Sequence, residues 1–139
     1  MASRLPGSLV LTCGLLALGV LGGAVSLGVQ RWQTQRQAEA VAHALTGGDA
    51  TRGKLAFSRY RCGACHSIRA LEGADGQVGP PLDKIAVRAF LAGSQPNDAA
   101  HMIAWVRHPQ AVEPGVGMPD MGLTDPEARD VAAYLYTLR

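Results

Sequence analysis

The chain has 139 residues, enough for one domain and at most one accessory segment. Its formal charge of +2, with no platform of basic and aromatic residues, gives no support for nucleic-acid binding. It contains only two Phe, two Trp and three Tyr, against 17 Gly and 8 Pro. These residues offer little bulk for a hydrophobic core, so the composition fits a fold centred on a buried apolar cofactor.

The N-terminal segment predicts a membrane anchor over residues 1–29. Residues 9–29 carry no charge, and as a helix rising about 1.5 Å per residue they would span a hydrocarbon core of roughly 30 Å. Trp32 follows at the position of an interfacial anchor. The alternative is a cleaved signal peptide with its exit site at Ala24-Val25-Ser26. It is disfavoured because the apolar run is long and continues to Val29.

Residues 30–48 are predicted to form a stalk that continues the membrane helix outward. Ala38, Val41, Ala42 and Leu45 recur near helical spacing, and Gly47-Gly48 ends the helix. The third predicted segment, residues 49–139, is the folded domain.

The first helix of that domain is expected to begin at Asp49 or Thr51, either of which can cap it, and to run through Tyr60. Directly after it comes Cys62-Gly63-Ala64-Cys65-His66, the C-x-x-C-H pattern of c-type haem attachment. Each thiol can form a thioether with a porphyrin vinyl group, and the imidazole can serve as proximal iron ligand.

Three other interpretations of Cys62, Cys65 and His66 are weaker. A thioredoxin-like redox pair would need a βαβ context, which the sequence lacks. A zinc site would need a second pair of ligands, but no cysteine follows Cys65. A structural disulfide would leave the histidine without a role. The motif therefore predicts one covalently attached haem c.

The haem motif also orients the anchor. Arg4 precedes the apolar run, while Arg31 and Arg36 follow it, so counting basic residues does not decide the orientation. Haem c is attached outside the bacterial cytoplasm. We therefore expect a single-pass protein of the bacterial inner membrane with residues 49–139 on the periplasmic side.

The segments after the motif are predicted to be loops and helices. Residues 68–76 read as a loop, and the two prolines at residues 79–82 indicate an extended, rigid segment. Helical patterns follow at residues 83–91 and 98–107, the second behind an Asn97-Asp98 cap and limited by Pro109.

The rest of the domain ends in its clearest helix. Residues 111–122 are rich in Gly and Pro and read as a loop. Thr124 and Glu127 then match a capping box, followed by an apolar stripe of Val131, Tyr134, Leu135 and Leu138. No hairpin or alternating strand pattern is visible, so the predicted fold class is all-α.

Residues 49–139 resemble the class I mono-haem cytochromes c, here in a membrane-anchored form. The resemblance is carried by Cys62-x-x-Cys65-His66, Gly79-Pro80-x-Leu82, Trp105 ahead of Pro109, Met118-Pro119 in a loop and a final helix ending Ala-Tyr134-Leu135. It implies that the first and last helices cross with Gly53, Phe57 and Tyr134 at the contact. His108 departs from the family, in which Asn often precedes the proline.

The resemblance also assigns roles around the haem. Met118 resembles the distal axial ligand opposite His66, and Pro80 the residue whose carbonyl accepts the proton of that imidazole. Leu82 resembles the apolar residue against the haem face, and Trp105 the tryptophan near the propionates.

The identity of the axial methionine leaves alternatives. Met118 is favoured because Gly117 and Pro119 flank it, while Met121 lies where relatives usually carry an aliphatic core residue. Met102 is expected in the core. His101 and His108 remain minor candidates.

The expected function is electron transfer by a membrane-tethered carrier rather than an enzyme. Its iron would cycle between Fe(II) and Fe(III) with His/Met ligation, and its partners would be a quinol:cytochrome c reductase, a terminal oxidase or a periplasmic dehydrogenase of a respiratory or photosynthetic membrane. An alternative is a fixed electron-entry subunit of a larger oxidoreductase. A haem-based gas sensor is weaker, because the sequence offers no second domain to carry a signal.

Overall fold

A computed structural model describes residues 7–139, except for the side chains of residues 7–10 and 12. The chain divides into two compact units, one ending at Arg36 and one comprising Gln37–Arg139. We call the second the folded unit.

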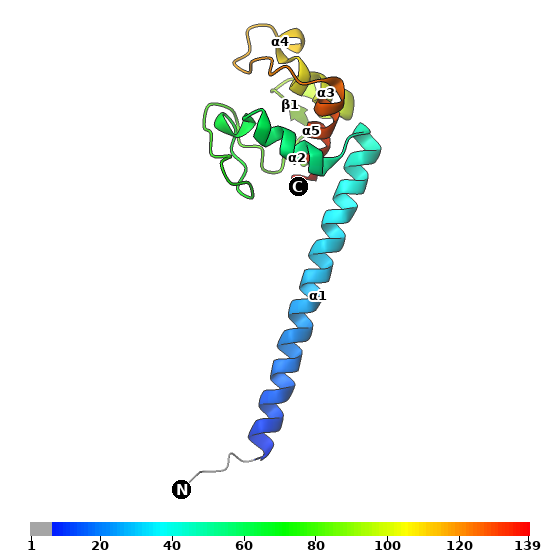
Figure 1. Cartoon of the computed structure of the whole chain (residues 1–139), viewed down its shortest axis with the longest axis vertical. Helices are drawn as coiled ribbons and strands as arrows, with labels where there is room; N and C mark the ends of the chain where they lie inside the picture. Colours follow the sequence, from blue (N-terminus) through cyan, green and yellow to red (C-terminus); the bar gives the residue numbers. More distant parts are fainter. Residues whose placement is uncertain (1–6) are drawn as a thin grey trace. The chain divides into compact units, whose positions relative to one another are not determined.

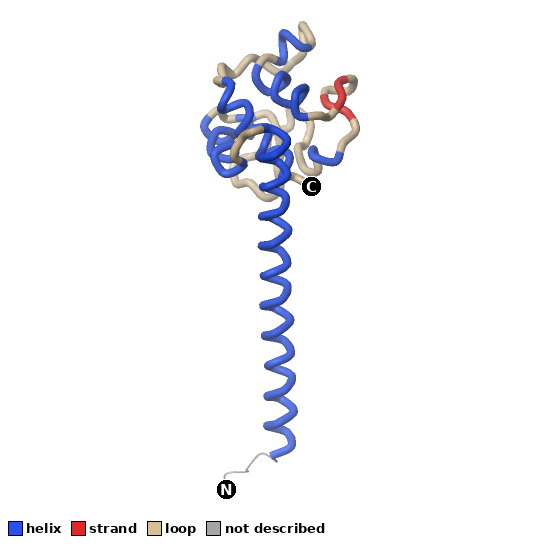
Figure 2. Tube along the Cα trace, turned by 90° about the vertical axis from the view of Figure 1, so that its right-hand side faces the viewer, coloured by secondary structure: helices blue, strands red, loops and turns tan. Residues whose placement is uncertain are grey.

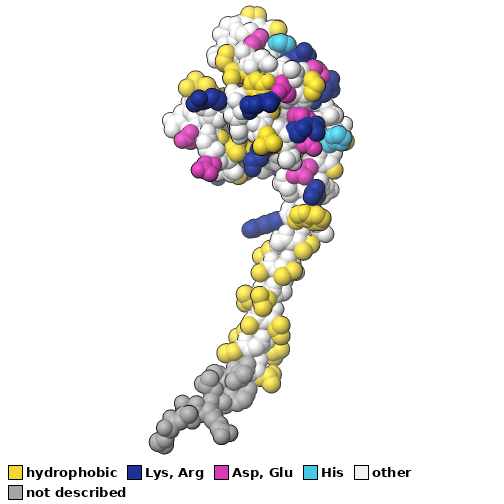
Figure 3. All heavy atoms as spheres, viewed as in Figure 1, with side chains coloured by type: hydrophobic (Ala, Val, Ile, Leu, Met, Phe, Trp, Pro, Cys, Tyr) yellow, Lys and Arg dark blue, Asp and Glu magenta, His cyan; other side chains and the backbone are white. Residues whose placement is uncertain are grey.

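The first unit consists of most of helix α1, which runs unbroken from Gly7 to Thr46 (Figure 1). By length and composition, Cys13–Thr46 could cross a membrane, with a mean hydropathy of 1.7 in its apolar part. The described side chains before Gln37 are exposed, and in Figure 3 hydrophobic groups follow the helix while charged groups gather over the folded unit. The predicted continuation of the apolar helix into residues 30–45 is confirmed, whereas Arg4 lies outside the described residues.

The last turns of α1 belong to the folded unit. Ala38, Ala42 and Thr46 are buried there, so this end of the predicted stalk packs with the domain. The helix ends at Thr46, and Gly47 directly after it has a φ of +69°, a left-handed conformation that glycine adopts without strain. The predicted boundaries at residues 29 and 48 remain predictions.

Helices α2 (Ala50–Arg59) and α5 (Asp125–Thr137) form the centre of the folded unit. Asp49 caps α2 by accepting the Arg52 N–H at 2.8 Å, and the predicted capping box begins α5. The crossing is close because Gly53 has no side chain: a Cβ there would lie 1.8 Å from the Asp130 carbonyl oxygen. Beside it, the rings of Phe57 and Tyr134 meet edge to face with centroids 5.8 Å apart. The predicted crossing of the first and last helices of the haem domain, α2 and α5, is therefore confirmed.

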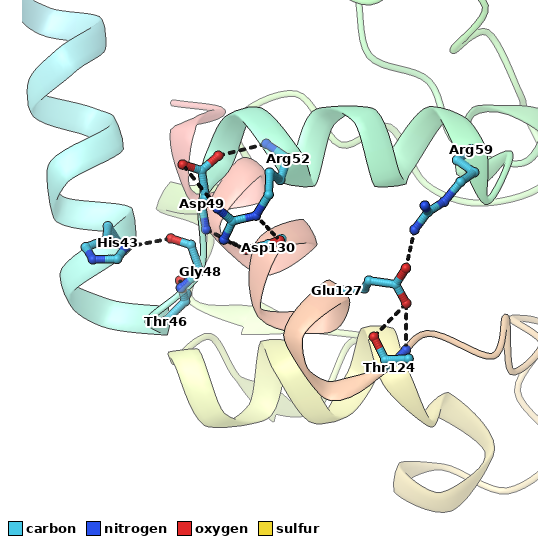
Figure 4. A network of polar contacts seen from close by, with 9 residues as sticks. All are labelled: His43, Thr46, Gly48, Asp49, Arg52, Arg59, Thr124, Glu127 and Asp130. Carbon is cyan, nitrogen blue, oxygen red and sulfur yellow. Dashed lines mark hydrogen bonds and ion pairs between the residues drawn. The ribbon is translucent and has the colours of Figure 1, made fainter.

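Polar contacts reinforce this crossing (Figure 4). Asp130, only 7% exposed, accepts two hydrogen bonds of 2.8 Å from Arg52 and one of 2.7 Å from the Asp49 amide. Burial raises the pKa of this carboxyl, but the bonds from Arg52 and Asp49 outweigh burial and leave the pKa below its ordinary value.

A second carboxylate of α5, that of Glu127, accepts hydrogen bonds near the other end of α2. Glu127 accepts hydrogen bonds from the hydroxyl and the amide of Thr124 and from the Tyr60 hydroxyl, and it pairs with Arg59. The bonds from Thr124, followed by that from Tyr60, lower the pKa of Glu127 to about 2. The crossing is thus braced by two ionised carboxylates on α5.

Shorter elements complete the folded unit. They are the 3₁₀ turns η1 (Cys62–Ala64) and η2 (Ile85–Val87), the strands β1 (Phe90–Leu91) and β2 (Gln95–Pro96), and the helices α3 (Ala99–Arg107) and α4 (Pro109–Val112). The α3 helix begins behind Asp98, as predicted, because that carboxylate accepts the His101 N–H at 3.0 Å. Pro109 ends the preceding run and opens α4, which occupies the start of the predicted loop.

The prediction of a helix at residues 83–91 is wrong. Lys84 takes a left-handed φ of +58°, a single 3₁₀ turn follows, and β1 then pairs with β2 in an antiparallel hairpin (Figure 2). Asn97 accounts for the difference, because its side-chain amide donates to the carbonyls of Ile85 and Arg88, both at 2.8 Å. Those carbonyls are thereby held outside a helical ladder. The fold class remains all-α apart from this small strand pair.

Candidate functional site

The folded unit encloses a cavity of about 520 Å³ with mainly apolar walls. Its lining is drawn from α2, α3, α5 and the segments between them. All of the predicted site residues line it: Cys62, Cys65, His66, Pro80, Leu82, Trp105 and Met118. The fold thus brings to one cavity residues that lie more than fifty positions apart in the chain.

The two cysteines of the motif are held where α2 gives way to η1. Arg61, with a left-handed φ of +55°, turns the chain directly before Cys62. Both thiols are free and half-buried, and burial raises the pKa of the Cys62 thiol to about 11. A redox-active pair needs a lowered thiol pKa, so this environment disfavours the thioredoxin-like interpretation.

His66 is oriented by the extended segment that follows. Its Nδ1 lies 2.9 Å from the Pro80 carbonyl oxygen, which can only accept, so Nδ1 carries the proton. Nε2 then keeps a lone pair, as a metal-binding imidazole requires. The Gly79 amide, in turn, donates to the Cys65 carbonyl at 2.8 Å, which ties this segment to the motif.

Gly79 lies directly against the imidazole. A Cβ at this position would come within 2.4 Å of Cε1 and 2.6 Å of Nδ1 of His66, so the close approach requires glycine. The contact was not predicted from the sequence, where Gly79 is only one residue of the Gly-Pro motif. Neither the motif nor the local spacing signals which side chain the glycine will face.

Gly63 lets another part of the backbone pack closely against the motif. A Cβ there would meet the Gly73 carbonyl oxygen at 2.6 Å and Ala74 Cα at 2.8 Å. Gly76 approaches the Ala64 carbonyl in the same way. Residues 68–76 therefore fold back onto the motif and fix its backbone.

Two methionines of one loop line the cavity. We call residues 113–122, between α4 and α5, the methionine loop. Met118 and Met121 are both half-buried and both contribute to the cavity wall, so lining alone does not choose between them. Met102, also in the wall, is 1% exposed and packs in the core as expected.

The two minor histidine candidates lie outside the cavity lining. His101 Nδ1 lies 2.7 Å from Asp98 Oδ2 on the surface of α3. His108 Nδ1 lies 3.4 Å from Asp120 Oδ2, in an exposed position. Both therefore belong to local surface contacts.

The donor set fits a covalently bound haem. The cavity volume falls within the roughly 300–1,000 Å³ typical of cofactor sites, and the walls are apolar. Two thiols, an imidazole and the thioethers of the two loop methionines, Met118 and Met121, line the same space. Among the described residues, no group of three His, Cys, Asp or Glu could hold a metal ion, which gives no support to a zinc site.

Comparison with known proteins agrees with this donor set. The cytochrome c family profile matches residues 50–139. A cytochrome c oxidase subunit 2 from Alkalihalophilus pseudofirmus is 33% identical over 93 residues, which cover 65% of this chain and 26% of that protein. No solved structure gives a significant match. Residues 50–139 form a cytochrome c domain, and the chain belongs to the cytochrome c family, which supports haem-based electron transfer.

Proposed function

We propose that this protein is a membrane-tethered electron carrier that holds one haem c with His66 and Met118 as axial ligands. When bound, the haem supplies one-electron Fe(II)/Fe(III) chemistry. The observation that carries the proposal is the convergence of Cys62, Cys65, His66 and Met118 on one apolar cavity.

In this proposal the chain's own residues anchor, orient and shield. Cys62 and Cys65 would hold the group by thioethers, and the Pro80 carbonyl keeps the proton on Nδ1 of His66. Leu82 and the other apolar lining residues exclude water, and Trp105, which also lines the cavity, would donate its indole N–H to a carboxylate of the haem. Because His66 and Met118 would both hold the iron, little room would be left for substrate chemistry, which favours a carrier over an enzyme.

The ligand assignment is tested with Met118→Ala and Met121→Ala. Methionine ligation gives the ferric protein a weak charge-transfer band at the red end of its spectrum. We expect Met118→Ala to lose this band and Met121→Ala to keep it. The opposite pattern would show that Met121 is the ligand.

The membrane anchor is tested by the intact mass of the native protein. A mass that includes residues 1–29 and one haem would support the uncleaved anchor, and its supporting feature is the long apolar helix α1. A mass that matches a chain beginning after Ser26 would show that the segment is a signal peptide. Protease protection of the haem domain in sealed inverted vesicles would test its periplasmic placement.

A second candidate is an electron-entry subunit of a larger oxidoreductase. It is favoured by the similarity to a cytochrome c oxidase subunit 2, although the match covers only 26% of that protein. In α1, Gly14, Gly19 and Gly22 have nothing within 4 Å of a Cβ, so their backbone is open to a close neighbour. Copurification of stoichiometric partners in mild detergent would favour the subunit, and a clean monomer would favour the free carrier.

A further inference from the structure

The methionine loop needs support from outside itself. It is rich in Gly and Pro, and within it Val116 N–H donates to the Glu113 carbonyl over a long 3.3 Å. Gly115 takes a left-handed φ of +84°. The glycines widen the range of backbone conformations open to this loop, so a group that holds one conformation sets how its methionines face the cavity.

Gln110 on α4 is the side chain that reaches into this loop. Its Nε2 lies 2.7 Å from the carbonyl oxygen of Val116 and 2.7 Å from that of Met118. Its Oε1 accepts the Gly115 N–H at 3.2 Å. The two carbonyls can only accept and the amide N–H can only donate, so these three contacts agree on one orientation of the carboxamide.

The base of this side chain is itself fixed. Gln110 follows Pro109, one of the most deeply buried residues of the folded unit, and Glu113 N–H closes the α4 turn on the Pro109 carbonyl at 2.8 Å. Asp120 Oδ1 accepts from the backbone N–H of Gln110 at 3.4 Å, which adds a longer contact from the far side of the loop. Gln110 therefore connects a rigid turn to the backbone on both sides of Gly117.

We propose that Gln110 is a positioning residue for the axial methionine. By holding the Val116 and Met118 carbonyls, it keeps the Met118 thioether facing the cavity and suppresses the conformations in which that ligand leaves the iron. The inference rests on the proposed function, in which Met118 is the distal ligand. Its consequence is that Gln110 controls how readily a small external base replaces the methionine.

The test uses the full-length ferric holoprotein in detergent, with imidazole as the competing ligand. Gln110→Met keeps the length of the side chain but removes all three hydrogen bonds. Two or three neutral hydrogen bonds correspond to roughly a ten- to hundredfold change in an equilibrium constant, so imidazole should bind about that much more tightly. Gln110→Glu keeps the acceptor for Gly115 but turns a carboxylate oxygen toward two carbonyls, and its effect should be at least as large.

Two controls separate positioning from general destabilisation. Gln77→Ala changes an exposed glutamine outside the cavity lining and should leave imidazole affinity at the wild-type value. Gly53→Ala, at the α2–α5 crossing, should lower the melting temperature without a comparable gain in imidazole affinity. Equal gains in Gly53→Ala and Gln110→Met would overturn the proposal.

The remaining outcomes distinguish this inference from the function on which it rests. Loss of the red charge-transfer band in Met118→Ala, with tighter imidazole binding in Gln110→Met, supports both. Loss of that band in Met118→Ala, with wild-type imidazole affinity in Gln110→Met, overturns the role of Gln110 alone. A band that persists in Met118→Ala overturns the ligand assignment and the positioning role together.

Discussion

Gly79→Ala should disturb the proximal histidine directly. A Cβ would lie 2.4 Å from Cε1 of His66, whereas nonbonded carbons rest about 3.5 Å apart, so ring and backbone must separate by about 1 Å. The ring cannot move away without straining the 2.9 Å hydrogen bond from Nδ1 to the Pro80 carbonyl. The substitution therefore combines overpacking with the loss of an orienting bond.

The expected cost follows from these two effects. Overpacking a close contact costs about 1–3 kcal/mol and losing a neutral hydrogen bond about 1 kcal/mol. Gly79 does not have a left-handed φ, so backbone strain adds nothing. A total of roughly 2–4 kcal/mol predicts a melting temperature lower by roughly 10–20 °C in a domain of this size. The reduction potential should rise, because an imidazole that no longer donates from Nδ1 is less basic and stabilises Fe(III) less.

The assay is thermal unfolding of the full-length holoprotein in detergent, followed by haem absorbance and far-ultraviolet circular dichroism, with potentiometry on the same samples. Gln77→Ala serves as the control, since this exposed residue lies only two positions before Gly79. A Gly79→Ala protein with the melting temperature and potential of wild type would refute the steric argument.

Two further predictions concern the α2–α5 crossing. Gly53→Ala should destabilise the protein by at least about 2 kcal/mol, because a Cβ 1.8 Å from the Asp130 carbonyl oxygen forces the helices apart. This cost outweighs the gain of about 1 kcal/mol in helix propensity. Urea unfolding should show the loss of stability, and the control Lys54→Ala, at an exposed position, should unfold near wild type. Glu127 has a folded-state pKa of about 2, below the value of about 4.3 in the unfolded chain, so its contribution is present above that higher value and disappears as the pH falls toward 2. Melting temperatures measured from pH 6 downward should therefore fall less steeply in Glu127→Gln, and an unchanged slope would exclude the carboxylate as a cause of acid destabilisation.

The helices of the folded unit could be predicted where their signals are local. Asp49 and Asp98 cap α2 and α3, and Thr124 with Glu127 begins α5, all as expected. Each cap joins residues only three positions apart, so the sequence carries the whole interaction.

The segment at residues 83–91 shows where local signals fail. Its helical pattern does not form a helix, because the Asn97 side chain donates hydrogen bonds to the carbonyls of Ile85 and Arg88, twelve and nine positions away. The spacing of these residues in the sequence does not predict the contact. Hydrogen bonds made after the chain has turned back on itself override weak local propensity.

The chemistry proposed for this site could be predicted from the sequence, because the two cysteines for thioether attachment and the histidine for the iron lie at a fixed spacing within Cys62–His66. The long apolar helix could also be predicted, since it depends only on composition and length. Three contacts are visible only in the folded protein: Gly79 lies against the His66 ring, Gln110 donates to the backbone around Met118, and Asp130 accepts from α2. These contacts join segments whose distance in space is set by the packing of the whole folded unit, so no short stretch of the chain encodes them.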